Sequence, residues 1–233
     1  EGGTGDGLVL IGRENAALIT DARYEEEYRE RLDEGVQLLV TRDYWGVAMA
    51  AAKRFKIENL GFEDTLPFRD FDYLDENFVG VDIAPVPALL EAIREVKDTD
   101  ELAKLRRSAE VAVEAFNEMI PQLHIGMTER QVANWLDRII KEKGAEKPSF
   151  DTIVASGYRG ALPHGTYSDK AIEAGDLVTI DFGYFVDGYT SDITRTLAFG
   201  ELDDESKTIY DVVLKAQRAT IDAVKPGVAD ADL

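Results

Sequence analysis

An Asp-Gly pair at residues 187 and 188 lies between two runs of alternating apolar and polar residues. A two-residue turn of type I′ needs a positive φ at both central positions, and Asp-Gly is one of the pairs that meet this demand. The pattern therefore predicts a β-hairpin that turns at Asp187 and Gly188. A hairpin centred there pairs Val186 with Tyr189 and Gly183 with Asp192, and this register decides which side chains share a face.

The predicted register brings two carboxylates together. Alternation places on one face Asp181, Gly183, Asp192 and Thr194, and on the opposite, packed face Val178, Ile180 and Phe182. Asp181 and Asp192 become diagonal neighbours, about 7–8 Å apart at the backbone, with Gly183 leaving the space between them free. Their repulsion has to be offset by a cation, a shared proton or an arginine. Two divalent ions about 3.5–4 Å apart are one solution; two solvated aspartates, or a β-bulge that breaks the register, are the alternatives.

Two histidines are the other residues with metal or proton chemistry. His164 lies in a loop, residues 157–169, that contains three glycines and one proline. Histidine is the commonest side chain for proton transfer and metal ligation, although a loop histidine by itself is more often a surface residue. His124 is expected at the end of a packed helix, where a cation offsets the helix dipole.

The chain divides by pattern into two regions. Short apolar strands at residues 8–11, 16–20 and 37–40 alternate with helices at 24–32 and 44–55, which predicts a small α/β unit over the first 95 residues. Beyond a proline-rich break at 84–87, Asp98 caps a helix expected to reach about His124, and Thr128 with Gln131 forms a capping box for a second helix to about Lys143. The face of the first helix expected to pack comprises Leu102, Leu105, Ala109, Ala112, Val113 and Phe116. A strand at 152–156 and a helix at 204–224 flank the hairpin region.

Composition excludes several classes of function. A formal net charge of −20 repels phosphate backbones and anionic membranes, so no nucleic-acid or membrane partner is expected. The absence of cysteine excludes disulfides, thiolate zinc sites and a cysteine nucleophile. No apolar run approaches the roughly 18 residues of a membrane span, and a cytoplasmic location is the default expectation.

Four motifs occur in order within about fifty residues: FDTIVAS at 150–156, ALPHG at 161–165, GDLVTIDFG at 175–183 and DGYTSDITRT at 187–196. Together they resemble the catalytic core of Xaa-Pro aminopeptidases and prolidases, which are pita-bread metallopeptidases. The segment ITDARY at 19–24 resembles part of their creatinase-like amino-terminal domain, and VKDTDELAKLRR at 96–107 resembles the first helix of the catalytic domain. The resemblance spans essentially the whole chain.

The resemblance implies an α/β creatinase-like amino-terminal domain, residues 1–95, followed by an incomplete α+β pita-bread domain, residues 96–233. It also implies two divalent metal ions, manganese first, with cobalt or zinc as alternatives. By motif position Asp181 chelates one ion, Asp192 bridges both, and His164 contacts the substrate, a peptide with proline at its second position. A homodimer is the expected assembly.

The chain departs from the family in one respect. The family uses two aspartates, one histidine and two glutamates as ligands, and the last three belong to motifs that should follow the final residue here. The chain by itself is therefore expected to be inactive, and the activity to belong to a longer parent protein. Creatinase, methionine aminopeptidase and an inactive peptidase-like binding module remain as alternatives.

Overall fold

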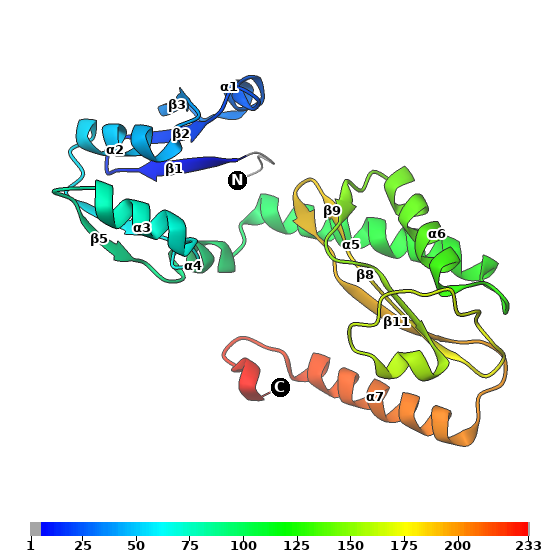
Figure 1. Cartoon of the computed structure of the whole chain (residues 1–233). Helices are drawn as coiled ribbons and strands as arrows, with labels where there is room; N and C mark the ends of the chain where they lie inside the picture. The colour runs from blue at the N-terminus through cyan, green and yellow to red at the C-terminus, as the bar shows by residue number, and fades with distance from the viewer. Residues whose placement is uncertain (1–5, 233) are drawn as a thin grey trace. The chain divides into compact units, whose positions relative to one another are not determined.

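The computed structural model describes residues 6–232 and divides the chain into two compact units, Glu1–Lys97 and Asp98–Leu233 (Figure 1). Each unit has its own hydrophobic core.

The first unit begins with a mixed three-stranded sheet. β1 (Gly7–Ile11) and β2 (Ala16–Thr20) form an antiparallel hairpin, and β3 (Val36–Val40) runs parallel to β2. A parallel pair needs a crossover, which here contains α1 (Glu25–Arg31). α2 (Tyr44–Arg54) follows β3 and begins at Asp43, whose side chain accepts a hydrogen bond from the backbone of Gly46 at 3.0 Å.

Four further elements complete the first unit. β4 (Asn59–Phe62) and β5 (Asp82–Pro85) pair in parallel, α3 (Phe68–Asn77) connects them, and α4 (Leu89–Glu95) follows. The small α/β unit is therefore as predicted, whereas α3, β5 and α4 were not anticipated. Its core consists of Leu10, Ile19, Ala48, Ala51, Ala52, Leu74 and Phe78.

The second unit opens with two helices, each started by a complete capping box. α5 (Thr99–Met119) is capped by Asp98 and Glu101, and α6 (Glu129–Glu142) by Thr128 and Gln131. α5 was predicted to continue to His124 but ends five residues earlier. The chain tightens there into the 3₁₀ turn η1 (Ile120–Gln122), because Pro121 has no N–H to donate to an α-helical hydrogen bond.

The buried face of α5 differs from the predicted one. Leu102 and Val113 are exposed, whereas the buried positions are Ser108, Val111, Ala112, Ala115, Phe116 and Met119. Ser108 takes a place in this face because its hydroxyl donates a hydrogen bond to the backbone carbonyl of Tyr184 at 3.0 Å. The apolar pattern alone could not predict Ser108 in the buried face of α5, because a serine is buried there only when its hydroxyl has a hydrogen-bond partner.

Antiparallel strands form the sheet of the second unit. β7 (Ile153–Ser156), β8 (Leu177–Phe182) and β11 (Ile193–Ala198) are ordered β11-β8-β7. β6 (Lys147–Pro148), β9 (Tyr184–Val186) and β10 (Tyr189–Thr190) form a shorter sheet ordered β10-β9-β6. α5 and α6 cover one side of β8, where Phe116 of α5 stacks on Phe182 with 5.3 Å between ring centroids. This packing joins β8 to the two helices.

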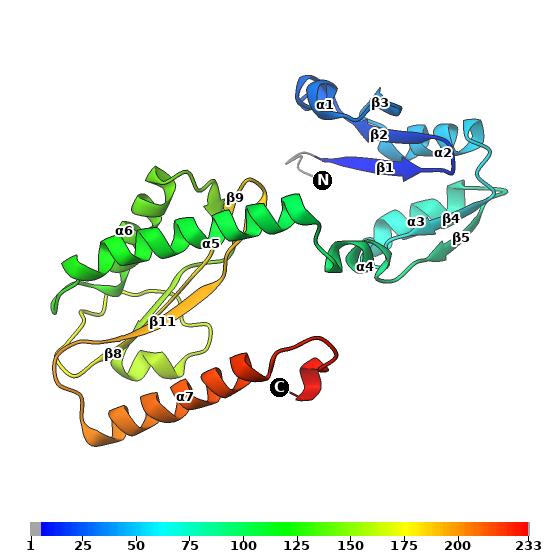
Figure 2. The ribbon, with the colours of Figure 1, turned by 180° about the vertical axis from the view of Figure 1, so that it is seen from behind.

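α7 (Asp204–Ala223) is capped by Asp203 and contains no buried residue. Figure 2 shows β8 and β11 between α7 and the pair α5 and α6. Several apolar side chains of α7 face solvent, namely Ile209, Val212, Val213 and Ile221. A short 3₁₀ turn, η3 (Asp230–Asp232), comes last in the described chain, and over residues 6–232 we find no helix with the length and hydropathy of a bilayer span.

Candidate functional site

The hairpin at Asp187 and Gly188 has the predicted register. Val186 pairs with Tyr189 and Asp181 with Thr194, and the backbone N–H of Ser191 donates to the carbonyl of Tyr184 at 3.1 Å. Asp187 and Gly188 have φ values of 50° and 75°, the left-handed conformation that a type I′ turn requires. The ladder is interrupted between Phe182 and Tyr184 and between Thr190 and Ile193, but the pairs on both sides of the interruption have the same register, as a hairpin without a bulge requires.

The two faces of β8 also separate as predicted. Val178, Ile180 and Phe182 are fully buried, whereas Asp181 is half-buried on the opposite face. The hydroxyl of Thr194 donates a hydrogen bond to Oδ1 of Asp181 at 2.7 Å. The carboxylate is thereby oriented while part of it stays open to solvent.

Asp192 is exposed and lies in the gap between β10 and β11, opposite Gly183 in the register. The backbone around Gly183 also requires a glycine at this position. A Cβ built there would lie 2.1 Å from the carbonyl oxygen of Ser191 and 2.5 Å from Oγ of Ser149. Close approach of neighbouring backbone therefore excludes a side chain at this position.

Asp181 and Asp192 supply carboxylate oxygens, which are suitable ligands for divalent ions such as manganese. Within residues 6–232 no group of three or more histidine, aspartate or glutamate side chains is arranged to hold a metal ion. The donor set of this chain therefore fits part of a metal centre. A dinuclear site needs further ligands to fix both ions.

His164 lies at the tip of a tight turn. The backbone N–H of Gly165 donates to the carbonyl of Leu162 at 3.1 Å, with Pro163 and His164 at the two central positions. The imidazole is exposed and forms no hydrogen bond with any described residue. Its position is therefore set by the backbone of the loop alone. His124 is also exposed, beyond the end of α5.

Sequence reasoning missed Glu129, the first residue of α6. Its side chain is fully buried and accepts hydrogen bonds from Ser156, Arg159 and Ser168. Burial raises the pKa of this carboxyl, but the hydrogen bonds from Ser168 and Ser156 outweigh burial and hold the pKa below its usual value. A glutamate in the first turn of a helix ordinarily faces solvent. The sequence around Glu129 therefore indicated the start of a helix but not a buried carboxylate.

In the first unit, the ITDARY segment forms an ion-pair cluster. Asp21 is buried and accepts hydrogen bonds from Nε of Arg23 at 3.0 Å and from the Tyr44 hydroxyl at 3.0 Å. Hydrogen bonds from Arg23 hold the pKa of the Asp21 carboxyl well below its usual range. This part of the motif thus anchors the loop after β2 to the start of α2.

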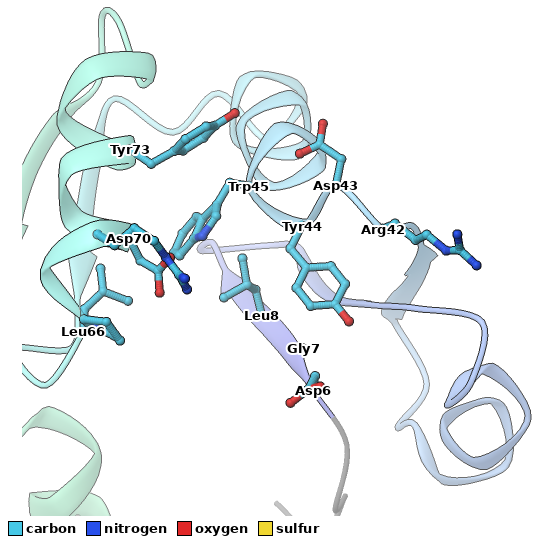
Figure 3. Close-up of a pocket in the computed structure, with 12 residues that line it drawn as sticks. Asp6, Gly7, Leu8, Arg42, Asp43, Tyr44, Trp45, Leu66, Asp70 and Tyr73 are labelled. Carbon is cyan, nitrogen blue, oxygen red and sulfur yellow. The ribbon is translucent and has the colours of Figure 1, made fainter.

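A cavity of about 680 Å³ opens beside this cluster, between β1, α2 and the start of α3 (Figure 3). Tyr44, Trp45 and Tyr73 contribute aromatic surface to it, and Asp70 faces Trp45 from α3. None of the predicted site residues lines this cavity.

Comparison with known proteins assigns the family. The model of metallopeptidase family M24 matches residues 103–233, and that of the creatinase/prolidase N-terminal domain matches residues 3–96. The chain therefore belongs to metallopeptidase family M24, with a creatinase-like amino-terminal domain followed by pita-bread sequence. Membership of this family implies divalent metal cofactors.

Proteins similar to this chain include two Xaa-Pro dipeptidases and an X-Pro aminopeptidase. The chain is 39% identical over 229 residues to the Xaa-Pro dipeptidase of Pyrococcus furiosus, covering 98% of this chain and 64% of that protein. It superposes on a Xaa-Pro dipeptidase from Bacillus anthracis with a TM-score of 0.88 and 38% identity, over 96% of this chain and 63% of that one. An X-Pro aminopeptidase from Thermotoga maritima matches with a TM-score of 0.84 and 35% identity, over 91% and 59%. The chain thus spans somewhat less than two thirds of these relatives' length.

Proposed function

We propose that the complete protein is a metal-dependent exopeptidase that hydrolyses the peptide bond before proline, as a dipeptidase or an aminopeptidase. The observation that carries the proposal is the hairpin in which Thr194 donates a hydrogen bond to Asp181 at 2.7 Å and Asp192 lies exposed just before β11, the strand that pairs with β8. Similarity to Xaa-Pro dipeptidases over nearly the whole chain supports it.

The residue roles belong to the proposal. Asp181 would chelate one of two divalent ions and Asp192 would bridge both, with manganese preferred over cobalt or zinc. Such ions supply Lewis-acid activation of water and of the scissile carbonyl. The remaining ligands would come from the part of the relatives' length that this chain does not span.

His164 would bind the substrate rather than a metal ion. It lies on a turn whose exposed imidazole has no hydrogen-bond partner among residues 6–232, so it can donate a hydrogen bond to a substrate carbonyl. A donor aimed at the oxygen that becomes charged in the transition state lowers the barrier to hydrolysis.

Other parts of the proposal concern the whole protein. We assign residues 1–95 to the creatinase-like domain and 96–233 to the pita-bread domain, and we propose a cytoplasmic homodimer that acts on peptides. The residues before 96 distinguish the chain from methionine aminopeptidase, which normally has no such domain. Retention of both aspartates distinguishes it from creatinase, which uses no metal.

Carboxylate-to-amide variants of the complete protein test these roles. Asp181→Asn and Asp192→Asn should each lower bound manganese and reduce turnover of a Xaa-Pro dipeptide by more than about 100-fold, because an amide oxygen is a neutral and weaker ligand. Asp187→Asn is the matched control, since asparagine tolerates the same left-handed turn conformation. The proposal fails if the first two variants keep wild-type metal content and activity.

A further inference from the structure

The buried carboxylate of Glu129 has no part in the roles proposed so far, although it is one of the most completely buried charges in the described chain. Oε1 accepts hydrogen bonds from the backbone N–H and the hydroxyl of Ser156, each at 2.8 Å. Oε2 accepts from Nε of Arg159 at 2.9 Å and from the backbone N–H and hydroxyl of Ser168 at 2.9 and 2.6 Å. A buried charge is tolerated when it is paired and hydrogen-bonded to this degree.

These donors flank the loop that carries His164. Ser156 and Arg159 precede the histidine and Ser168 follows it, so a single carboxylate ties both ends of the loop together. Arg159 adds a second tie, because its Nη2 donates to the carbonyl of Thr166 at 2.6 Å. The first turn of α6 adds a third, since the backbone N–H of Arg130 donates to the carbonyl of Ser168 at 3.0 Å.

The same network reaches the strand that carries Asp181. Nζ of Lys170 donates to Oγ of Ser156 at 3.0 Å and pairs with Asp176 at 2.8 Å. Asp176 immediately precedes β8, which contains Asp181. Two carboxylates and two cations alternate along this path, from Arg159 through Glu129 and Lys170 to Asp176, so the charges balance.

We propose that Glu129 is a positioning residue for catalysis: it fixes the loop that presents His164 relative to the strand that carries Asp181. The inference rests on the proposed function, because it assumes that His164 contacts the substrate. His164 has no side-chain partner in the described chain, so its place is only as definite as the loop backbone. A displacement of about 1 Å at a reacting group costs up to about 100-fold in rate.

A double-mutant cycle in the complete enzyme, loaded with manganese, tests this. Ser168→Ala removes one donor to Glu129 and leaves the loop sequence around His164 intact. It should lower kcat for a Xaa-Pro dipeptide by about tenfold, with metal content and KM within about twofold of the wild type. His164→Ala should lower kcat further without loss of metal. In the His164→Ala background, Ser168→Ala should have almost no additional effect.

Asp169→Asn is the matched control, because Asp169 adjoins Ser168 but its carboxylate forms an exposed ion pair with the side chain of Arg130 and donates nothing to Glu129. It should leave kcat unchanged. Equal effects of Ser168→Ala in both backgrounds would reduce Glu129 to a purely structural role and overturn the inference. If kcat falls in His164→Ala but stays at the wild-type value in Ser168→Ala, only the positioning role of Glu129 is overturned. If kcat stays at the wild-type value in His164→Ala, the proposed role of His164 is overturned as well.

Hydrogen exchange provides a readout that needs no turnover. Backbone amides of residues 157–167 should exchange at least about tenfold faster in Ser168→Ala and in Glu129→Gln than in the wild type, while those of β8 stay protected. An unchanged exchange rate for this loop in Ser168→Ala would contradict the inference, whether or not Glu129→Gln folds.

Discussion

At the scale of single residues, the buried carboxylates Asp21 and Glu129 both form hydrogen bonds that hold loops in place. Asp21 fixes the loop after β2 through Arg23 and Tyr44, and Glu129 fixes the loop of His164. The carboxylate of Asp181, by contrast, is only half-buried and accepts one hydrogen bond among the described residues, from the hydroxyl of Thr194. The carboxylate with spare lone pairs is thus the one suited to bind a cation.

The lowered pKa of Glu129 predicts how its contribution depends on pH. Because the pKa is lower in the folded than in the unfolded state, the stabilisation is fully present above the unfolded value, about 4.3, and is lost as pH falls through the folded value. The difference in thermal midpoint between wild type and Glu129→Gln should therefore be widest at pH 6–7 and shrink on acidification below about pH 4. Melting both proteins across this range checks the sign. A difference that grows at low pH would show that folding raises the pKa of Glu129 instead of lowering it.

At the scale of elements, the hairpin from β8 to β11 was accessible from sequence because two local rules agree. The Asp187–Gly188 turn fixes the register, and the period of two fixes the faces. Its partner strand β7 and the packing on α5 involve residues far apart in sequence. Local periodicity assigned Ala109 and Val113 to the packed face of α5, but the sheet selected Ser108 and Val111 instead.

Gly183 offers a test of the hairpin at this scale. Gly183→Ala forces a methyl group into the carbonyl of Ser191 and should lower the free energy of unfolding by about 1–3 kcal/mol, the usual cost of overpacking. Gly160→Ala is the control, because a Cβ there meets nothing within 4 Å. Urea denaturation of both variants measures the difference. Equal stability of the two would mean that the backbone near Ser191 is free to move away.

The candidate site was predictable only in part, because local patterns do not show contacts between residues that lie far apart in the sequence. The residues Asp181, Asp192 and His164 stand in motifs that a reader of the sequence can recognise, and the register of the aspartates follows from the turn. Glu129 could not be found in this way, because its partners Ser156 and Ser168 lie 27 and 39 residues away. Only the packing of α6 against β7 and the loop brings them together.

At the scale of the whole molecule, the chain spans 64% of the length of the Pyrococcus furiosus dipeptidase and 63% of the Bacillus anthracis structure that it resembles. The described residues hold no complete metal cluster, and α7 exposes Ile209, Val212 and Ile221 without burying any residue. An exposed apolar stripe of this kind is a surface that other protein would ordinarily cover.

The most direct test of the central proposal is the selectivity of the complete protein for proline. Two dipeptides with the same first residue, one ending in proline and one in alanine, should be compared at saturating manganese by their kcat/KM values. We predict a ratio of at least about 100 in favour of proline, equivalent to roughly 3 kcal/mol in transition-state binding. Equal values for the two peptides, or no hydrolysis of either with manganese, cobalt or zinc, would contradict it.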